Sequence, residues 1–92
     1  MNEVEKQLLK SAQDGCITAF EQLIAPYRKG VFNLMLKTCE NEFEASQLAQ
    51  EVFVRVFSSM IKGNLKGGFA VSIYRTADEI VRRNACKSEM IS

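Results

Sequence analysis

The side chains that most often perform chemistry in proteins are scarce in this sequence. Its 92 residues contain no histidine, so the commonest general base is missing, and no nucleophile is paired with a base. Cys16, Cys39 and Cys86 are far apart and form no CxxC pair, which argues against a zinc site in a chain without histidine. No glycine-rich loop of the phosphate-binding type is present. We therefore expect no catalytic residue, no metal and no cofactor, and the chain is not expected to be an enzyme.

The strongest pattern in the chain separates apolar from polar side chains around residues 44–57. Apolar residues recur there at three- and four-residue steps, which predicts one buried helix face that Phe53 and Phe57 widen. Asn41 and Glu44 form a capping box that would begin the helix. The face expected to be buried consists of Ala45, Leu48, Ala49, Val52, Val56 and Met60.

Polar residues occupy the rest of that helix, including Gln47, Gln50, Glu51, Arg55 and Ser58. The ordinary interpretation of such a face is a solvated surface of a bundle helix.

Charge is unevenly distributed although the net charge is only +1. Residues 1–61 carry six basic and eight acidic side chains, a net charge of −2, whereas residues 62–92 carry six basic and three acidic, a net charge of +3. A basic C-terminal third indicates a polyanion contacted from one end of the chain, although the excess is small.

Length and composition indicate one small globular domain that spans residues 1–92. Apolar residues make up 47% of the chain, but their runs are too short and too interrupted by charge to span a bilayer. No signal-peptide pattern opens the chain, and three unpaired thiols suit a reducing compartment. We expect a cytoplasmic protein with no membrane partner.

The periodic patterns predict helices and no strands, so the expected fold class is all-α, a compact bundle of about four helices. The four predicted helices cover about residues 2–13, 18–39, 42–61 and 69–88.

Several residues are expected to set the ends and shapes of these helices. Gly15 should end the first, and Thr18 with Glu21 forms a capping box for the second. Pro26 lies inside the second pattern and should kink it. The inward faces are predicted to include Val4 in the first helix and, in the second, Leu34. In the fourth they comprise Ile73, Ala77, Ile80 and Val81.

Three segments match the pattern of a known family in order and spacing. Residues 19–23 read AFEQL, like the family's AFEEL; residues 44–55 read EASQLAQEVFVR, like DAEDLVQEVFLR; residues 69–77 read FAVSIYRTA, like FRAWLYRIA. On these segments the whole chain resembles region 2, the promoter-opening domain of bacterial sigma factors, most closely those of the extracytoplasmic-function (ECF) kind.

The resemblance implies that the helix at residues 42–61 binds the clamp coiled coil of core RNA polymerase. A charged stripe beside an apolar one suits a wet interface with a basic coiled coil. The residues carried over as polymerase contacts are Gln47, Gln50, Glu51 and Arg55.

The resemblance also implies that residues 62–68 and the fourth helix melt the minus-ten element of promoter DNA and capture a flipped base of the non-template strand. The glycines of this loop would allow close backbone approach to a nucleotide, or form an ordinary flexible connection. Tyr74 is expected in the core, with stacking on a base as the alternative. Candidate DNA contacts are Lys62, Asn64, Lys66, Arg75, Glu79, Arg82 and Arg83.

The chain departs from the family pattern at several positions. Ser46 and Gln47 replace the acidic pair of DAEDL, and Ser72 stands where the family has tryptophan. Asp78 and Glu79 replace a basic residue and an asparagine that touches the promoter.

A carboxylate at position 79 would repel phosphate unless Arg75 or Arg83, each four residues away, neutralises it. These departures indicate a divergent member with weakened promoter binding.

Two functions therefore stay open, beside the plainer alternative of a helical domain that binds neither polymerase nor DNA. The first is a transcription initiation module that binds core polymerase and promoter DNA. The second is a sigma-like interaction module that binds polymerase or an anti-sigma factor without promoter recognition. The family's region 4, a helix-turn-helix that reads the minus-thirty-five element, has no counterpart in residues 1–92 and would come from a tethered segment or a separate protein. We expect the 92-residue polypeptide not to start transcription unaided.

Overall fold

Four helices follow one another along the chain in this computed structural model, which describes residues 3–39, 41–63 and 68–91, with side chains as far as Asn84. The helices are α1 (Glu3–Gln13), α2 (Ile17–Cys39), α3 (Glu42–Ile61) and α4 (Phe69–Ile91). No strand occurs within those ranges. The predicted all-α bundle is confirmed, and α4 continues three residues beyond its expected end.

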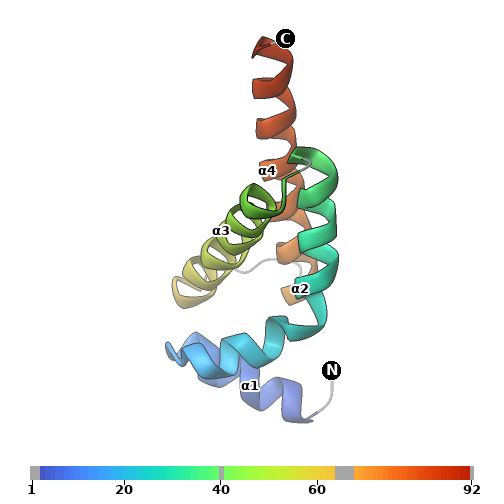
Figure 1. Ribbon diagram of the computed structural model, residues 1–92. Coiled ribbons are helices and arrows are strands. Elements are labelled where there is room, and N and C mark those ends of the chain that lie inside the picture. The colour runs from blue at the N-terminus through green and yellow to red at the C-terminus, as the bar shows by residue number, and fades with distance from the viewer. Residues whose placement is uncertain (1–2, 40, 64–67, 92) are drawn as a thin grey trace.

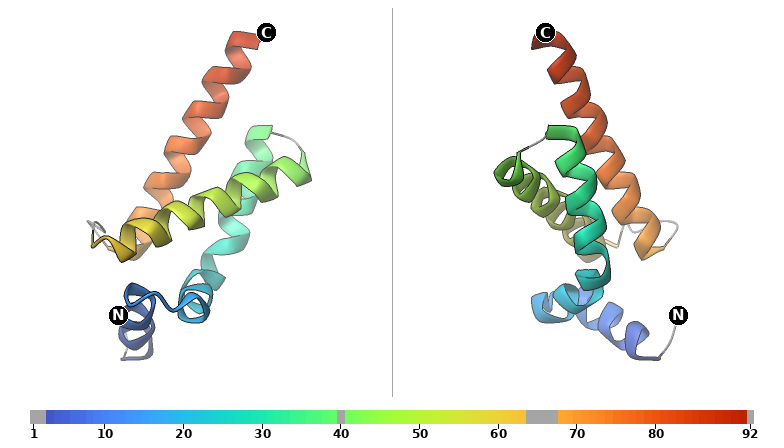
Figure 2. Two further views of the ribbon diagram at one scale, coloured as in Figure 1. Left: turned by 90° about the vertical axis from the view of Figure 1, so that its left-hand side faces the viewer. Right: turned by 45° about the vertical axis from the view of Figure 1, so that its right-hand side comes forward.

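The second helix holds the bundle together, because α2 packs against α1, α3 and α4. Figures 1 and 2 show α4 beside the second half of α2, and α3 crossing both. The first helix lies at the end of the molecule opposite the C-terminus (Figure 1) and packs against α2 and α3, with no contact to α4 among the described residues. The result is an elongated body of 48 × 22 × 20 Å.

A bend divides α2 into two parts with different directions (Figure 1). Pro26 lies inside this helix, where its ring clashes with the preceding turn and removes one backbone hydrogen bond. The predicted kink is thus present. It allows the first part of α2 to pack near α1 and the second part to run beside α4.

The core is apolar and receives side chains from all four helices. The predicted inward face of α3 is buried, with Leu48 partly so, and the inward face of α4 is confirmed with Val81 partly buried. Two predictions are wrong: Val4 is exposed because it lies in the first turn of α1, and Leu34 is exposed at the border of the α2 stripe that Val31 and Met35 occupy. The largest fully buried side chains are Met35, Met60, Ile73, Ile80, Val31, Val52 and Val56.

The predicted helix ends are confirmed at two places and wrong at one. The Asn41 side chain accepts a hydrogen bond of 3.0 Å from the Glu44 amide, which caps α3 as expected. Gly15 adopts a φ of +99° after α1, the left-handed conformation that glycine accommodates. Thr18 is not a cap, because α2 already begins at Ile17 and the Cys16 carbonyl accepts the first helical hydrogen bond.

The membrane prediction can be compared with the helices directly. None of those in the described ranges combines the length and the hydropathy needed to cross a bilayer.

Candidate interaction surfaces on α3 and α4

The solvent side of α3 carries apolar side chains that the sequence analysis missed. Phe43 is 70% exposed, Val54 59% and Ile61 50%. Together with the residues between them, they form one line along the helix whose members follow at alternating steps of four and three residues. This is the spacing of a coiled-coil seam. We call this line the outer seam of α3; it consists of Phe43, Gln47, Gln50, Val54, Phe57 and Ile61.

The outer seam contains two of the four predicted polymerase contacts, Gln47 and Gln50, and both are exposed. Phe43, Val54 and Ile61 were missed because the inward stripe of the same helix gave the stronger pattern, and Phe57 had been assigned to that inward stripe. The signal that could have found them is the second set of three- and four-residue steps that starts at Phe43.

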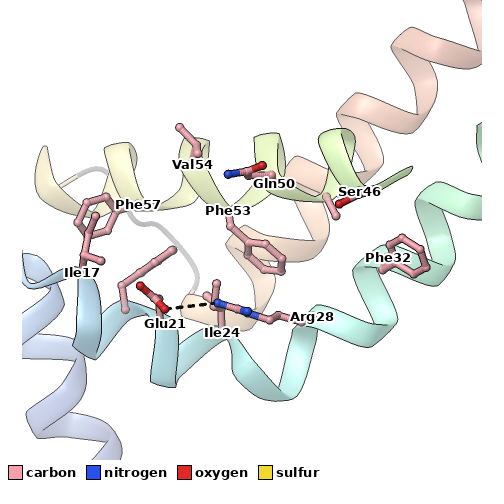
Figure 3. A pocket seen from close by; sticks show the side chains of 12 residues that line it. Ile17, Glu21, Ile24, Arg28, Phe32, Ser46, Gln50, Phe53, Val54 and Phe57 are labelled. Atoms are coloured by element: carbon pink, nitrogen blue, oxygen red, sulfur yellow. Dashed lines mark ion pairs between the residues drawn. The ribbon is translucent and has the colours of Figure 1, made fainter. Parts of the chain in front are cut away.

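A groove of about 620 Å³ adjoins the outer seam between α2 and α3. Figure 3 shows Phe53 pointing from α3 toward α2. An ion pair of 3.9 Å between Glu21 and Arg28 crosses the α2 side of the groove (Figure 3). The lining residues are Ile17, Phe20, Glu21, Ile24, Arg28, Phe32, Ser46, Ala49, Gln50, Phe53, Val54 and Phe57.

The other two predicted polymerase contacts, Glu51 and Arg55, lie on the side of α3 that faces α4. One carboxylate oxygen of Glu51 accepts a hydrogen bond of 2.8 Å from Arg83 of α4, and the Arg55 guanidinium lies 2.8 Å from the same oxygen. The Arg83 hydrogen bond and the charges of both arginines hold the pKa of Glu51 below its usual value. The structure therefore joins a predicted DNA contact to predicted polymerase contacts.

A shallow polar depression of about 440 Å³ lies between α3 and α4, next to the ion-pair cluster of Glu51, Arg55 and Arg83. Glu79 lines it and pairs with neither Arg75 nor Arg83, since Arg83 is bound to Glu51 instead. The neutralisation of Glu79 that its spacing from Arg75 and Arg83 allowed is therefore not realised. The residues of the depression are Val54, Arg55, Ser58, Ser59, Thr76 and Glu79.

The outer face of α4 holds an exposed aromatic ring that was expected in the core. Tyr74 is 52% exposed, and its ring touches Tyr27 of α2 edge-on, with centroids 6.1 Å apart. Its hydroxyl oxygen lies about 4.0 Å from where a Cβ on Gly30 would be, so this side chain covers α2 where α2 has no side chain of its own. The core prediction for Tyr74 is wrong, and the stacking alternative stays a proposal.

The remaining predicted DNA contacts differ in how the structure places them. Arg75 is exposed one position after Tyr74, and Arg82 pairs with Asp78 at 3.1 Å along the outside of α4. Lys62 is exposed at the end of α3. Two further candidates, Asn64 and Lys66, lie outside the described residues.

The described residues on either side of positions 64–67 are both glycines with a positive φ. Gly63 adopts a φ of +74° and donates a hydrogen bond of 3.1 Å to the Met60 carbonyl, and Gly68 adopts a φ of +96° before α4. Side chains with a Cβ rarely adopt these angles, so the ends of the loop depend on glycine.

The chain is similar to two curated sigma factors. It is 30% identical over 77 residues to the RNA polymerase sigma-H factor of Pseudomonas aeruginosa, a match that covers 82% of this chain and 39% of the relative. It is 25% identical over 80 residues to the ECF RNA polymerase sigma factor SigW of Bacillus subtilis, covering 87% of this chain and 43% of the relative. No protein-family model and no solved structure matches the chain significantly.

These two similarities support a relationship to the sigma-factor family. The chain spans about two fifths of the length of the relatives that it matches.

Proposed function

We propose that this chain is a region 2-like module of a transcription initiation factor. It binds core RNA polymerase through α3, and it binds the minus-ten promoter element through the loop at residues 62–68 and through α4. The observation that carries the proposal is the similarity to two sigma factors over most of the chain, together with the exposed apolar residues Phe43, Val54 and Ile61 along the outer seam of α3.

The outer seam supports the polymerase half of the proposal. A partner helix of the clamp coiled coil would cover Phe43, Val54 and Ile61, with Gln47 and Gln50 making hydrogen bonds between them. The groove beside the seam gives such a helix a concave apolar border. Glu51 and Arg55 then lie at the margin of this interface rather than at its centre, because they face α4.

The outer face of α4 supports the DNA half. The half-exposed ring of Tyr74 offers a stacking surface for an unpaired base, and Arg75 beside it offers a cation for the adjoining phosphate. Lys62 extends the positive charge toward the loop.

A second function is favoured by the carboxylates of the same surface. Asp78 and Glu79 oppose the arginines of α4, and a face with so little net positive charge binds nucleic acid weakly. In this alternative the chain is a sigma-like interaction module that binds polymerase or an anti-sigma factor without recognising a promoter.

The polymerase contact is tested by Val54→Asp. This change places a charge at the centre of the outer seam without disturbing the core, because Val54 is largely exposed. We expect affinity for purified core RNA polymerase to fall by at least about fivefold, since burying an unpaired carboxylate in an apolar interface costs more than ~1 kcal/mol. The affinity is measured by fluorescence anisotropy of the labelled chain.

Val71→Asp is the matched control, because it makes the same exchange at an exposed valine of α4. It should leave polymerase affinity unchanged. Equal affinities for the wild type and Val54→Asp would contradict the assignment of the outer seam.

A further inference from the structure

The guanidinium of Arg83 is occupied in the isolated chain. It donates a hydrogen bond of 2.8 Å to the same Glu51 oxygen that Arg55 approaches at 2.8 Å. This contact joins α3 to α4 and spans 32 positions in the sequence, so the packing of the two helices creates it. A phosphate that binds Arg83 must compete with the Glu51 carboxylate for the same donor groups.

The other two arginines in the described part of α4, Arg75 and Arg82, differ in whether a carboxylate occupies them. Arg82 is paired with Asp78, whereas Arg75 makes no ion pair among the described residues. Glu79 lies in the adjoining depression and adds a further negative charge. Arg75 is therefore the one arginine of the described part of α4 that could meet a phosphate without first leaving a carboxylate.

The Arg83 contact can open at modest cost. The Arg83 side chain is 52% exposed and that of Glu51 is 34% exposed, so water screens the attraction between them. A contact of this strength shifts a competing equilibrium by a few fold and does not abolish binding.

We propose that Glu51 acts as an intramolecular competitor of nucleic acid for Arg83, and so lowers the affinity of this chain for single-stranded DNA. The proposal rests on the proposed function of the α4 face. It assigns to Glu51 a regulatory effect on nucleic-acid binding, in addition to its position at the margin of the polymerase surface.

The test compares Glu51→Gln with wild type in binding a fluorescein-labelled single-stranded oligonucleotide over a series of salt concentrations. The amide keeps the shape of the side chain and removes its charge. We expect affinity at low salt to rise by about three- to fivefold, the upper limit corresponding to an exposed ion pair of ~1 kcal/mol. The salt dependence should steepen by up to about 0.7 ion for one released cation on a single strand.

Glu21→Gln is the matched control, because Glu21 is also paired with an arginine, Arg28, but lies on α2 in the groove away from α4. It changes the net charge equally and should produce a clearly smaller gain. In an Arg83→Ala background, Glu51→Gln should produce no larger gain than Glu21→Gln does. A gain that equals that of the control, or that persists without Arg83, would overturn the competition.

The rate at which phenylglyoxal modifies Arg83, followed by peptide mass spectrometry, reports the contact without any DNA. Modification should be faster in Glu51→Gln than in Glu21→Gln, and equal rates would overturn the proposal. If the wild type binds the oligonucleotide and Glu51→Gln binds it no more tightly, the competition is overturned, whereas the proposed DNA contact stands. Absence of binding in every variant overturns the proposed DNA contact and the competition with it.

Discussion

Tyr74 shows that the exposure of a side chain depends on where the neighbouring helices lie. In the sequence it precedes Arg75 and follows Ile73, within a helix whose apolar stripe could include it. In the structure Ile73 is fully buried, whereas Tyr74 is about half exposed and its ring contacts that of Tyr27 edge-on. The helical pattern alone could not separate these two positions, because the border of the buried face depends on how closely α2 approaches.

The functional weight of that ring can be measured. Tyr74→Ala should weaken binding to a single-stranded oligonucleotide by about fivefold or more, since stacking of one base on an aromatic side chain is worth ~1–3 kcal/mol. Tyr74→Phe keeps the ring and should bind like the wild type. Affinities are compared by anisotropy at one low salt concentration, and equal weakening by both substitutions would argue against stacking.

The Glu51 contact shows the same limit of sequence reasoning for charged residues. Pairs four residues apart on one helix, such as Arg55 with Glu51, follow directly from helix geometry. The bond between Glu51 and Arg83 depends on the crossing of α3 and α4, which no spacing in the sequence specifies. By sequence spacing, Glu79 could pair with either of two arginines on its own helix. In the folded protein one of them, Arg83, pairs with Glu51 of α3 instead.

At the scale of the helix, local signals were sufficient for the number and approximate bounds of the elements. Apolar periodicity identified all four helices, and the Asn41 cap and the Gly15 stop were read correctly because each acts within one turn. The sequence at Thr18 matched a capping box equally well, but Thr18 does not cap α2, because the helix already begins at Ile17. The outer seam was missed because α3 has two apolar stripes and only the inner one is needed for the fold.

The cap of α3 provides a test of this local reasoning. Asn41→Ala removes the acceptor for the Glu44 amide and should lower the free energy of unfolding by about 1 kcal/mol, within the ~0.5–2 kcal/mol typical of such caps. The measurement is urea unfolding followed by circular dichroism.

Asn33→Ala makes the same exchange at an exposed position inside α2. Alanine favours a helix interior more than asparagine does, so this control should be neutral or slightly stabilising. A loss of stability equal to that of Asn41→Ala would indicate that the cap contributes nothing specific.

At the scale of the whole molecule, the bend in α2 allows one helix to contact three others. The sequence predicted a kink at Pro26 but not its direction, which is determined by where the buried side chains on either side of it find partners. The same packing brings two polymerase candidates, Glu51 and Arg55, next to two DNA candidates, Glu79 and Arg83, between α3 and α4. Their proximity therefore follows from the bundle, whereas the sequence had assigned them to separate helices.

The peripheral position of α1 has a consequence for the exchange of backbone amide hydrogens. This helix has one fully buried residue, Ala12, and it packs against α2 and α3 without reaching α4. By contrast, α3 buries six residues along its length. An element with so few buried contacts opens by local unfolding at a lower free energy than the whole domain. In deuterated buffer, peptides from α1 should take up deuterium well before those from α3, and equal protection of the two helices would show that the bundle opens as one cooperative unit.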